Sequence, residues 1–171
     1  MSTEVILVID MIKGFFRESF PLYCGDKARE IIPYVVDFLR NCPDLPIIYP
    51  CDHHAPDDRE FQMLPPHCIE GTEETELIEE LRPFPGIILP KTRFNALYQT
   101  GLVDILQKMG VDTVTIMGAC TDTCVFFTAA GLRDRDYTVK VPSQGVASFS
   151  SSEVQLFALK QMETVLGVKI I

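Results

Sequence analysis

Asp10, Lys91 and Cys124 are the residues of this chain best suited to nucleophilic chemistry. Asp10 ends an apolar run, where a partly buried carboxylate has a raised pKa and can shuttle a proton. The alternative is a helix cap or a surface carboxylate. A thiol such as Cys124 in the first turn of a helix is predicted to have a lowered pKa, although most free cysteines are small buried hydrophobic residues. A lysine close to both a carboxylate and a thiol would favour the thiolate. The alternative for Lys91 is an ordinary solvated lysine.

The three histidines of the chain all lie in the segment 50–71, which has no clear periodicity. Asp52 and His54 are two residues apart, so on an extended segment they point to one side and His53 points to the other. With His67 they make a set of two histidines and one carboxylate, which can bind a divalent ion and leave positions open for water or substrate. Zinc is the first choice, and iron or manganese suit the same ligands. The alternative is a polar surface loop.

Predicted strands and helices alternate along the chain and must position these side chains. Apolar runs predict strands at 4–9, 46–49, 86–89, 113–117, 138–141 and 168–170, with Gly118 ending the fourth. Helical spacing predicts helices over 26–41, 72–81, 101–109, 121–135 and 150–165. Pro33 predicts a start or bend near Ile32, Thr72 is a candidate N-cap, and Ser150 to Glu153 has the spacing of a capping box.

This alternation predicts right-handed βαβ crossovers and a mostly parallel sheet covered by helices on both faces, a three-layer α/β/α sandwich. Ligands bind beyond the carboxyl ends of the strands in such folds. The rule brings together one set of segments from distant parts of the chain: Asp10, Cys51 with Asp52, Pro90 with Lys91, and Gly118 to Cys124.

The length and composition of the chain indicate its domain number and exclude some classes of partner. A chain of 171 residues with 47% apolar residues fits one domain over 1–171. The net charge of −9 and the lack of a basic run argue against nucleic acid and anionic lipid as partners. We find no secretion signal or membrane-spanning segment, so we expect a cytoplasmic protein. The six cysteines are then expected to be free thiols, with a disulfide framework as the alternative because six is an even number.

Several of these segments resemble a known family. Val8-Ile9-Asp10-Met11, Pro90-Lys91 and Gly118-x-x-Thr121-Asp122-x-Cys124-Val125 resemble the isochorismatase-like cysteine hydrolases. Asp52-x-His54 and Pro65-Pro66-His67-Cys68-Ile69-x-Gly71-Thr72 resemble the nicotinamidase branch of that family. The motifs follow the order of the family over nearly the full chain.

The resemblance implies a metal-containing cysteine amidohydrolase that releases ammonia from a small carboxamide such as nicotinamide through a thioester. It implies a cis peptide between Ala119 and Cys120, so that the N–H groups of Cys120 and Cys124 form an oxyanion hole. It also assigns the roles of two sets of residues: a catalytic triad of Asp10, Lys91 and Cys124, and the metal ligands Asp52, His54 and His67.

Two positions near the expected substrate pocket bear on specificity. Phe15 matches the aromatic residue that lies beside the ring in nicotinamidases, whereas Leu64 stands where that branch commonly has tryptophan. Met11-Ile12-Lys13 also replaces the usual Gln-Asn pair after the first aspartate. The alternatives are a relative that hydrolyses another small amide, a ureide or a vinyl ether, and a catalytically silent binding or scaffold protein. We also expect a homo-oligomer.

Overall fold

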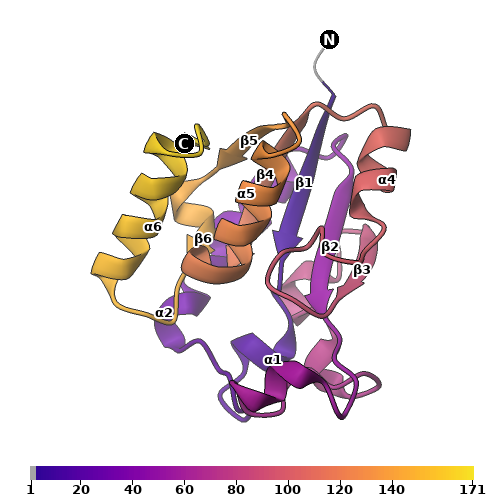
Figure 1. Ribbon diagram of the computed structural model, residues 1–171, viewed down its shortest axis with the longest axis vertical. Coiled ribbons are helices and arrows are strands. Elements are labelled where there is room, and N and C mark those ends of the chain that lie inside the picture. The colour runs from indigo at the N-terminus through magenta and orange to yellow at the C-terminus, as the bar shows by residue number, and fades with distance from the viewer. Residues whose placement is uncertain (1–2) are drawn as a thin grey trace.

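The computed structural model describes residues 3–171 and has three layers, with a parallel sheet between two layers of helices (Figure 1). The strand order is β3-β2-β1-β4-β5-β7. The short β6 pairs with the end of β4, past the point where β5 stops. All pairings in this sheet are parallel. The strands are β1 (Glu4–Ile9), β2 (Ile47–Asp52), β3 (Ile87–Lys91), β4 (Thr113–Ala119), β5 (Thr138–Val141), β6 (Val146–Ala147) and β7 (Lys169–Ile170).

Alternate residues of the central strands face two separate cores, because side chains alternate across a strand. Val5, Leu7 and Ile9 pack with α4 (Leu102–Lys108), α5 (Phe126–Arg133) and α6 (Ser152–Thr164). Ile6 and Val8 pack on the other face with α1 (Lys13–Phe16), α2 (Asp26–Arg29) and α3 (Ile32–Asn41). The predicted α/β sandwich is therefore confirmed.

Three strands extend further than the apolar runs predicted. β2 continues to Asp52, β3 to Lys91 and β4 to Ala119, so Gly118 does not end its strand. Gly118 pairs with Ile9 at a φ of +118°, and a Cβ at this position would lie 2.0 Å from the Ile9 carbonyl oxygen. Only glycine allows so close an approach of the two backbones.

The predicted helix over 72–81 is wrong. This segment forms two 3₁₀ turns, Glu73–Thr75 and Glu79–Leu81, and Thr72 makes no side-chain cap. Residues 76–78 instead pair with the segment after β1, where the Ile78 N–H donates to the Met11 carbonyl at 3.1 Å and Leu77 bridges Ile12. These tertiary hydrogen bonds outweigh the local helix signal.

The remaining helical segments differ from prediction mainly at their ends. The predicted helix 26–41 is two helices, and the second begins at Ile32 with Pro33 in its first turn, as expected. The segment predicted as a helix over 121–135 begins with a π-helical turn, Thr121–Val125, before α5. The N-cap of α6 is Ser151 rather than Ser150, since the Ser151 hydroxyl accepts from the Val154 N–H.

Two further expectations can be compared with the structure. All six cysteines are free, as predicted, which removes the disulfide framework as an alternative. Within residues 3–171, no helix combines the length and the apolar character needed to span a membrane.

Candidate active site

The carboxyl ends of β1, β2 and β3 bring three charged residues together. The arrows of β1 and β2 point toward α1 in Figure 1, and the site lies at that end of the sheet. Asp10 follows β1 in the left-handed region with a φ of 53°, and its Oδ1 accepts the Asp52 N–H at 2.9 Å. Asp52 and Lys91 are register partners at the ends of β2 and β3. The chain crossovers, rather than any local motif, therefore set this geometry.

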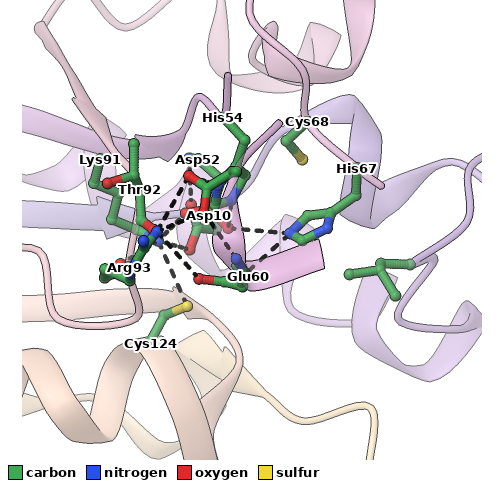
Figure 2. A network of polar contacts seen from close by, with 12 residues as sticks. Asp10, Asp52, His54, Glu60, His67, Cys68, Lys91, Thr92, Arg93 and Cys124 are labelled. Carbon is green, nitrogen blue, oxygen red and sulfur yellow. Dashed lines mark hydrogen bonds and ion pairs between the residues drawn. The ribbon is translucent and has the colours of Figure 1, made fainter. Parts of the chain in front are cut away.

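The predicted catalytic residues are in mutual contact and almost fully buried (Figure 2). Lys91 Nζ lies 2.8 Å from Asp10 Oδ2 and 3.6 Å from Cys124 Sγ, and it forms a short contact with Asp52 Oδ1. Cys124 and Asp10 are close enough for each to shift the pKa of the other. The π-helical turn before α5 carries Cys124 to this point, opposite the strand ends.

Burial dominates the electrostatics of this cluster. Burial and the Asp52 charge raise the pKa of Asp10 to about 7, against the opposing effect of Lys91. Burial also raises the pKa of Cys124 well above its usual range, and the Lys91 ammonium does not compensate. The expectation of a lowered thiol pKa is therefore wrong, because removing the thiolate from water costs more than the nearby charge returns. The resting pair is a neutral thiol beside a carboxylate that titrates near neutrality.

The other two charges of the cluster stay fixed. Burial alone would lower the pKa of Lys91, but Asp10 and Asp52 outweigh it and raise that pKa well above its usual range. Burial alone would likewise raise the pKa of Asp52, but Lys91 and His54 outweigh it and lower it to about 2. Lys91 thus remains an ammonium and Asp52 a carboxylate at neutral pH.

The predicted metal ligands also converge. Asp52, His54 and His67 are buried, and one ligand atom from each lies within 4.8 Å of the others. The Asp52 Oδ2 is 3.6 Å from His54 Nε2 and 3.9 Å from His67 Nε2. His53 is not in this group, and its ring contacts the Cys51 carbonyl instead, as the alternation along an extended segment predicted.

Both imidazole rings are held with one nitrogen toward Asp52. His54 Nδ1 is 3.1 Å from Asp58 Oδ2, and His67 Nδ1 is 2.8 Å from the Pro65 carbonyl. Such outer contacts are typical of metal-ligating histidines, because they fix the ring and its tautomer. His54 Nε2 is buried without a hydrogen-bond partner. An unpartnered, inward-facing nitrogen beside a carboxylate fits a divalent cation.

Sequence reasoning missed Glu60, which completes this corner of the site. Glu60 is buried, and its Oε1 lies 3.9 Å from His67 Nε2. Burial raises its pKa, with Asp52 adding to the effect. Arg93 Nη1 lies 3.8 Å from Glu60 Oε2 and donates a hydrogen bond to Asp58 Oδ1 at 2.9 Å. The sequence feature that could have identified Glu60 is the pair Asp58-x-Glu60 between His54 and His67.

A cavity of about 460 Å³ opens onto both groups of residues. Phe15 and Leu64, predicted to bind substrate, lie in its wall, as do Cys120 and Cys124. The Ala119–Cys120 peptide is cis, as the family resemblance implied. Sequence reasoning missed other wall residues, which are Pro21, Leu22, Tyr23, Cys24, Phe94 and Phe149.

Known structures with this fold include several amidases. The chain resembles a pyrazinamidase/nicotinamidase from Streptococcus mutans UA159 (29% identity, TM-score 0.94, covering 99% of this chain and 100% of that one). It resembles an N-carbamoylsarcosine amidase from Thermoplasma acidophilum (28%, TM-score 0.87, 98% and 95%). It also resembles a pyrazinamidase from Pyrococcus horikoshii in complex with zinc (26%, TM-score 0.89, 98% and 98%).

The sequence itself matches a single family over nearly its whole length. The isochorismatase domain family matches residues 4–170. That match includes all the residues of the buried charge cluster and of the candidate metal group. The chain therefore belongs to the isochorismatase family.

Proposed function

We propose that this protein is a metal-containing cysteine amidohydrolase that releases ammonia from a small, uncharged carboxamide such as nicotinamide. The observation that carries the proposal is the buried contact of Asp10, Lys91 and Cys124, because Asp10 and Cys124 line the same cavity as Asp52 and His67. At the level of reaction class, an amide-hydrolysing enzyme is confirmed by the family and by its amidase neighbours.

The geometry supports a proton transfer before attack. Asp10 accepts the proton of the neutral Cys124 thiol, and the sulfur attacks the carbonyl carbon of the amide. Lys91 stays protonated and stabilises the negative charge that remains in the cluster. The N–H groups of Cys120 and Cys124 stabilise the developing oxyanion.

The remaining steps use the same carboxyl group in reverse. Asp10, now protonated, gives its proton to the departing nitrogen as the C–N bond breaks, so that ammonia leaves and a thioester with Cys124 remains. Asp10 then takes a proton from water and the hydroxide attacks the thioester. As the C–S bond breaks, Asp10 returns that proton to the Cys124 sulfur. A carboxylic acid and the Cys124 thiol are the products. A pKa near 7 suits a group that must both accept and donate a proton.

We assign the orientation of the substrate to the candidate metal site. Asp52, His54 and His67 would hold one divalent ion, and Glu60 lies beside them to accept a further contact. Zinc is the first choice, because two imidazoles and a carboxylate suit it, while iron or manganese fit the same set. The bound ion would supply a positive charge and a coordination position for a heteroatom of the substrate or for its water.

The cavity wall favours an uncharged substrate. Aromatic and aliphatic side chains make up most of it, including Phe15 and Leu64. The charged residues in the wall are Asp10, Asp52 and Glu60, and no lysine or arginine of the described chain lines it. Among the wall residues, a substrate carboxylate would meet three carboxyl groups and no lysine or arginine, which leaves the proposed metal ion as its cationic partner. This argues for a neutral carboxamide over a ureido or carbamoyl acid.

Release of ammonia across a panel of amides tests the proposal. The panel contains nicotinamide, pyrazinamide, small aliphatic amides and N-carbamoylsarcosine, each with wild-type protein and with Cys124→Ala. We expect the wild type to hydrolyse neutral amides and Cys124→Ala to retain less than a few per cent. Cys68→Ala is the matched control, because that thiol is buried outside the reaction path, and it should keep most of the activity. Turnover by Cys124→Ala would refute the nucleophile.

A further inference from the structure

Two thiols face each other in the wall of the catalytic cavity, and the proposed mechanism uses neither sulfur. Cys24 Sγ and Cys120 Sγ lie 3.5 Å apart. Both residues line the cavity, and each is only 8% exposed. They are 96 positions apart in the sequence, so the fold alone brings them together. The segment before α2 carries Cys24, and the cis peptide after β4 carries Cys120.

We infer that Cys24 and Cys120 are a site of oxidative modification, where a small hydroperoxide entering the cavity converts the two thiols into a reversible disulfide. Sulfur atoms in a disulfide are about 2.05 Å apart, so this pair has to close by about 1.5 Å. Rotations about the two Cα–Cβ bonds act directly on that distance. The cavity gives a small oxidant a path to both sulfurs.

The chemistry balances in two steps. The Cys24 sulfur attacks one oxygen of the hydroperoxide, so that an S–O bond forms and the O–O bond breaks. The proton of the Cys24 thiol goes to the leaving oxygen, which departs as an alcohol or water. The Cys120 sulfur then attacks the sulfenic acid, the S–S bond forms, the S–O bond breaks and water leaves with the Cys120 proton. Two thiols are oxidised and one hydroperoxide is reduced. The contact with Cys24 and burial raise the pKa of Cys120, so the Cys120 thiol keeps its proton until the second step, where that proton leaves with the water.

Closing this pair would disturb both sides of the active site. The Cys24 N–H donates to the Phe15 carbonyl at 2.9 Å, so Cys24 is tied to the aromatic wall. The Cys120 carbonyl accepts from the N–H groups of Thr123 and Val125 at 3.1 Å each, in the turn that carries Cys124. A misplacement of about 1 Å at a reacting group costs about 100-fold in rate, so we expect oxidation to lower turnover at least about tenfold. That effect on turnover rests on the proposed function, whereas the disulfide itself does not.

Peptide mapping after treatment with hydrogen peroxide tests the inference. Wild type, Cys24→Ser and Cys42→Ser are oxidised, free thiols are alkylated, and the digests are searched for a peptide that links positions 24 and 120. Cys42 follows α3 on the same face of the sheet and is the matched control. We expect the linked peptide in wild type and Cys42→Ser, together with a loss of ammonia release that dithiothreitol restores. Cys24→Ser should give no such peptide and should retain at least tenfold more activity at the same dose.

The possible failures can be told apart. Oxidised wild type without the linked peptide overturns the disulfide, whatever the protein hydrolyses. A linked peptide with unchanged ammonia release overturns the regulatory effect and leaves the proposed function standing. If no amide releases ammonia before oxidation, the proposed function fails, and the peptide map still decides the disulfide. Cys24→Ala repeats the comparison if Cys24→Ser does not fold.

Discussion

Asp10→Asn tests the central step, the transfer of a proton from Cys124 to a carboxylate. The asparagine keeps an Oδ1 that can accept the Asp52 N–H, now 2.9 Å away, but it cannot take a proton. A positioned general base contributes about 10²–10⁴-fold to rate. We therefore expect kcat/KM for nicotinamide to fall by that factor, with the fold retained.

The pH dependence of kcat/KM measures the contribution of Asp10 in a second, independent way. Asp10 must be ionised to act as the base, and its pKa is raised to about 7. Below that value kcat/KM should fall about tenfold per pH unit, so that the rate at pH 5 is about 100-fold below its plateau. Above pH 7 the profile should level off, because the buried Cys124 stays a thiol until its proton moves to Asp10.

The assay is the initial rate of ammonia release between pH 5 and pH 9, at substrate concentrations that give kcat/KM. A kcat/KM that continues to rise with pH above 8 would refute this mechanism, because it would mean that loss of the Cys124 thiol proton to solvent limits the reaction. Residual activity in Asp10→Asn with the same pH midpoint would exclude Asp10 as the titrating group.

The same raised pKa predicts an effect on stability. The folded-state pKa of Asp10 lies above its ordinary value of 3.8, so the group favours the folded state below pH 4, and that contribution is lost as pH rises toward about 7. The difference corresponds to about 4 kcal/mol as an upper bound. Urea unfolding of wild type and Asp10→Asn between pH 4 and pH 8 should show this loss only in the wild type. Parallel curves for the two proteins would contradict it.

Three further outcomes are expected. His67→Ala should purify with less than half the metal of wild type by elemental analysis, while His53→Ala, whose ring faces away from the group, should match the wild type. Removal of the metal with a chelator should abolish ammonia release, and added zinc should restore it. Leu64→Trp should lower the KM for nicotinamide about fivefold with little change in kcat, since a second aromatic face in the wall that holds Phe15 adds about 1 kcal/mol of stacking. An unchanged KM would place Leu64 outside the binding surface.

The layered fold and most of the candidate site follow from patterns in the amino-acid sequence. Continuous apolar runs require strands that are buried on both faces, and such strands in alternation with helices leave few topologies. The rule that ligands bind at the carboxyl ends of parallel strands selects Asp10, Asp52 and Lys91 without the help of any motif. The spacing of Asp52 and His54 placed both on one side of a strand, and the structure has them there.

Other features of the protein arise from long-range packing, which local sequence patterns do not encode. The segment 72–81 carries a helix signal but pairs with residues 11–13, since hydrogen bonds to a distant strand end outweigh weak propensity. The thiol pKa of Cys124 depends on how completely neighbouring elements exclude water, and that burial reverses the expected direction. Glu60 and the Cys24–Cys120 pair lie at the site because of packing between segments far apart in sequence. Sequence spacing fixes which residues share a face, whereas distance and desolvation arise only when those faces meet.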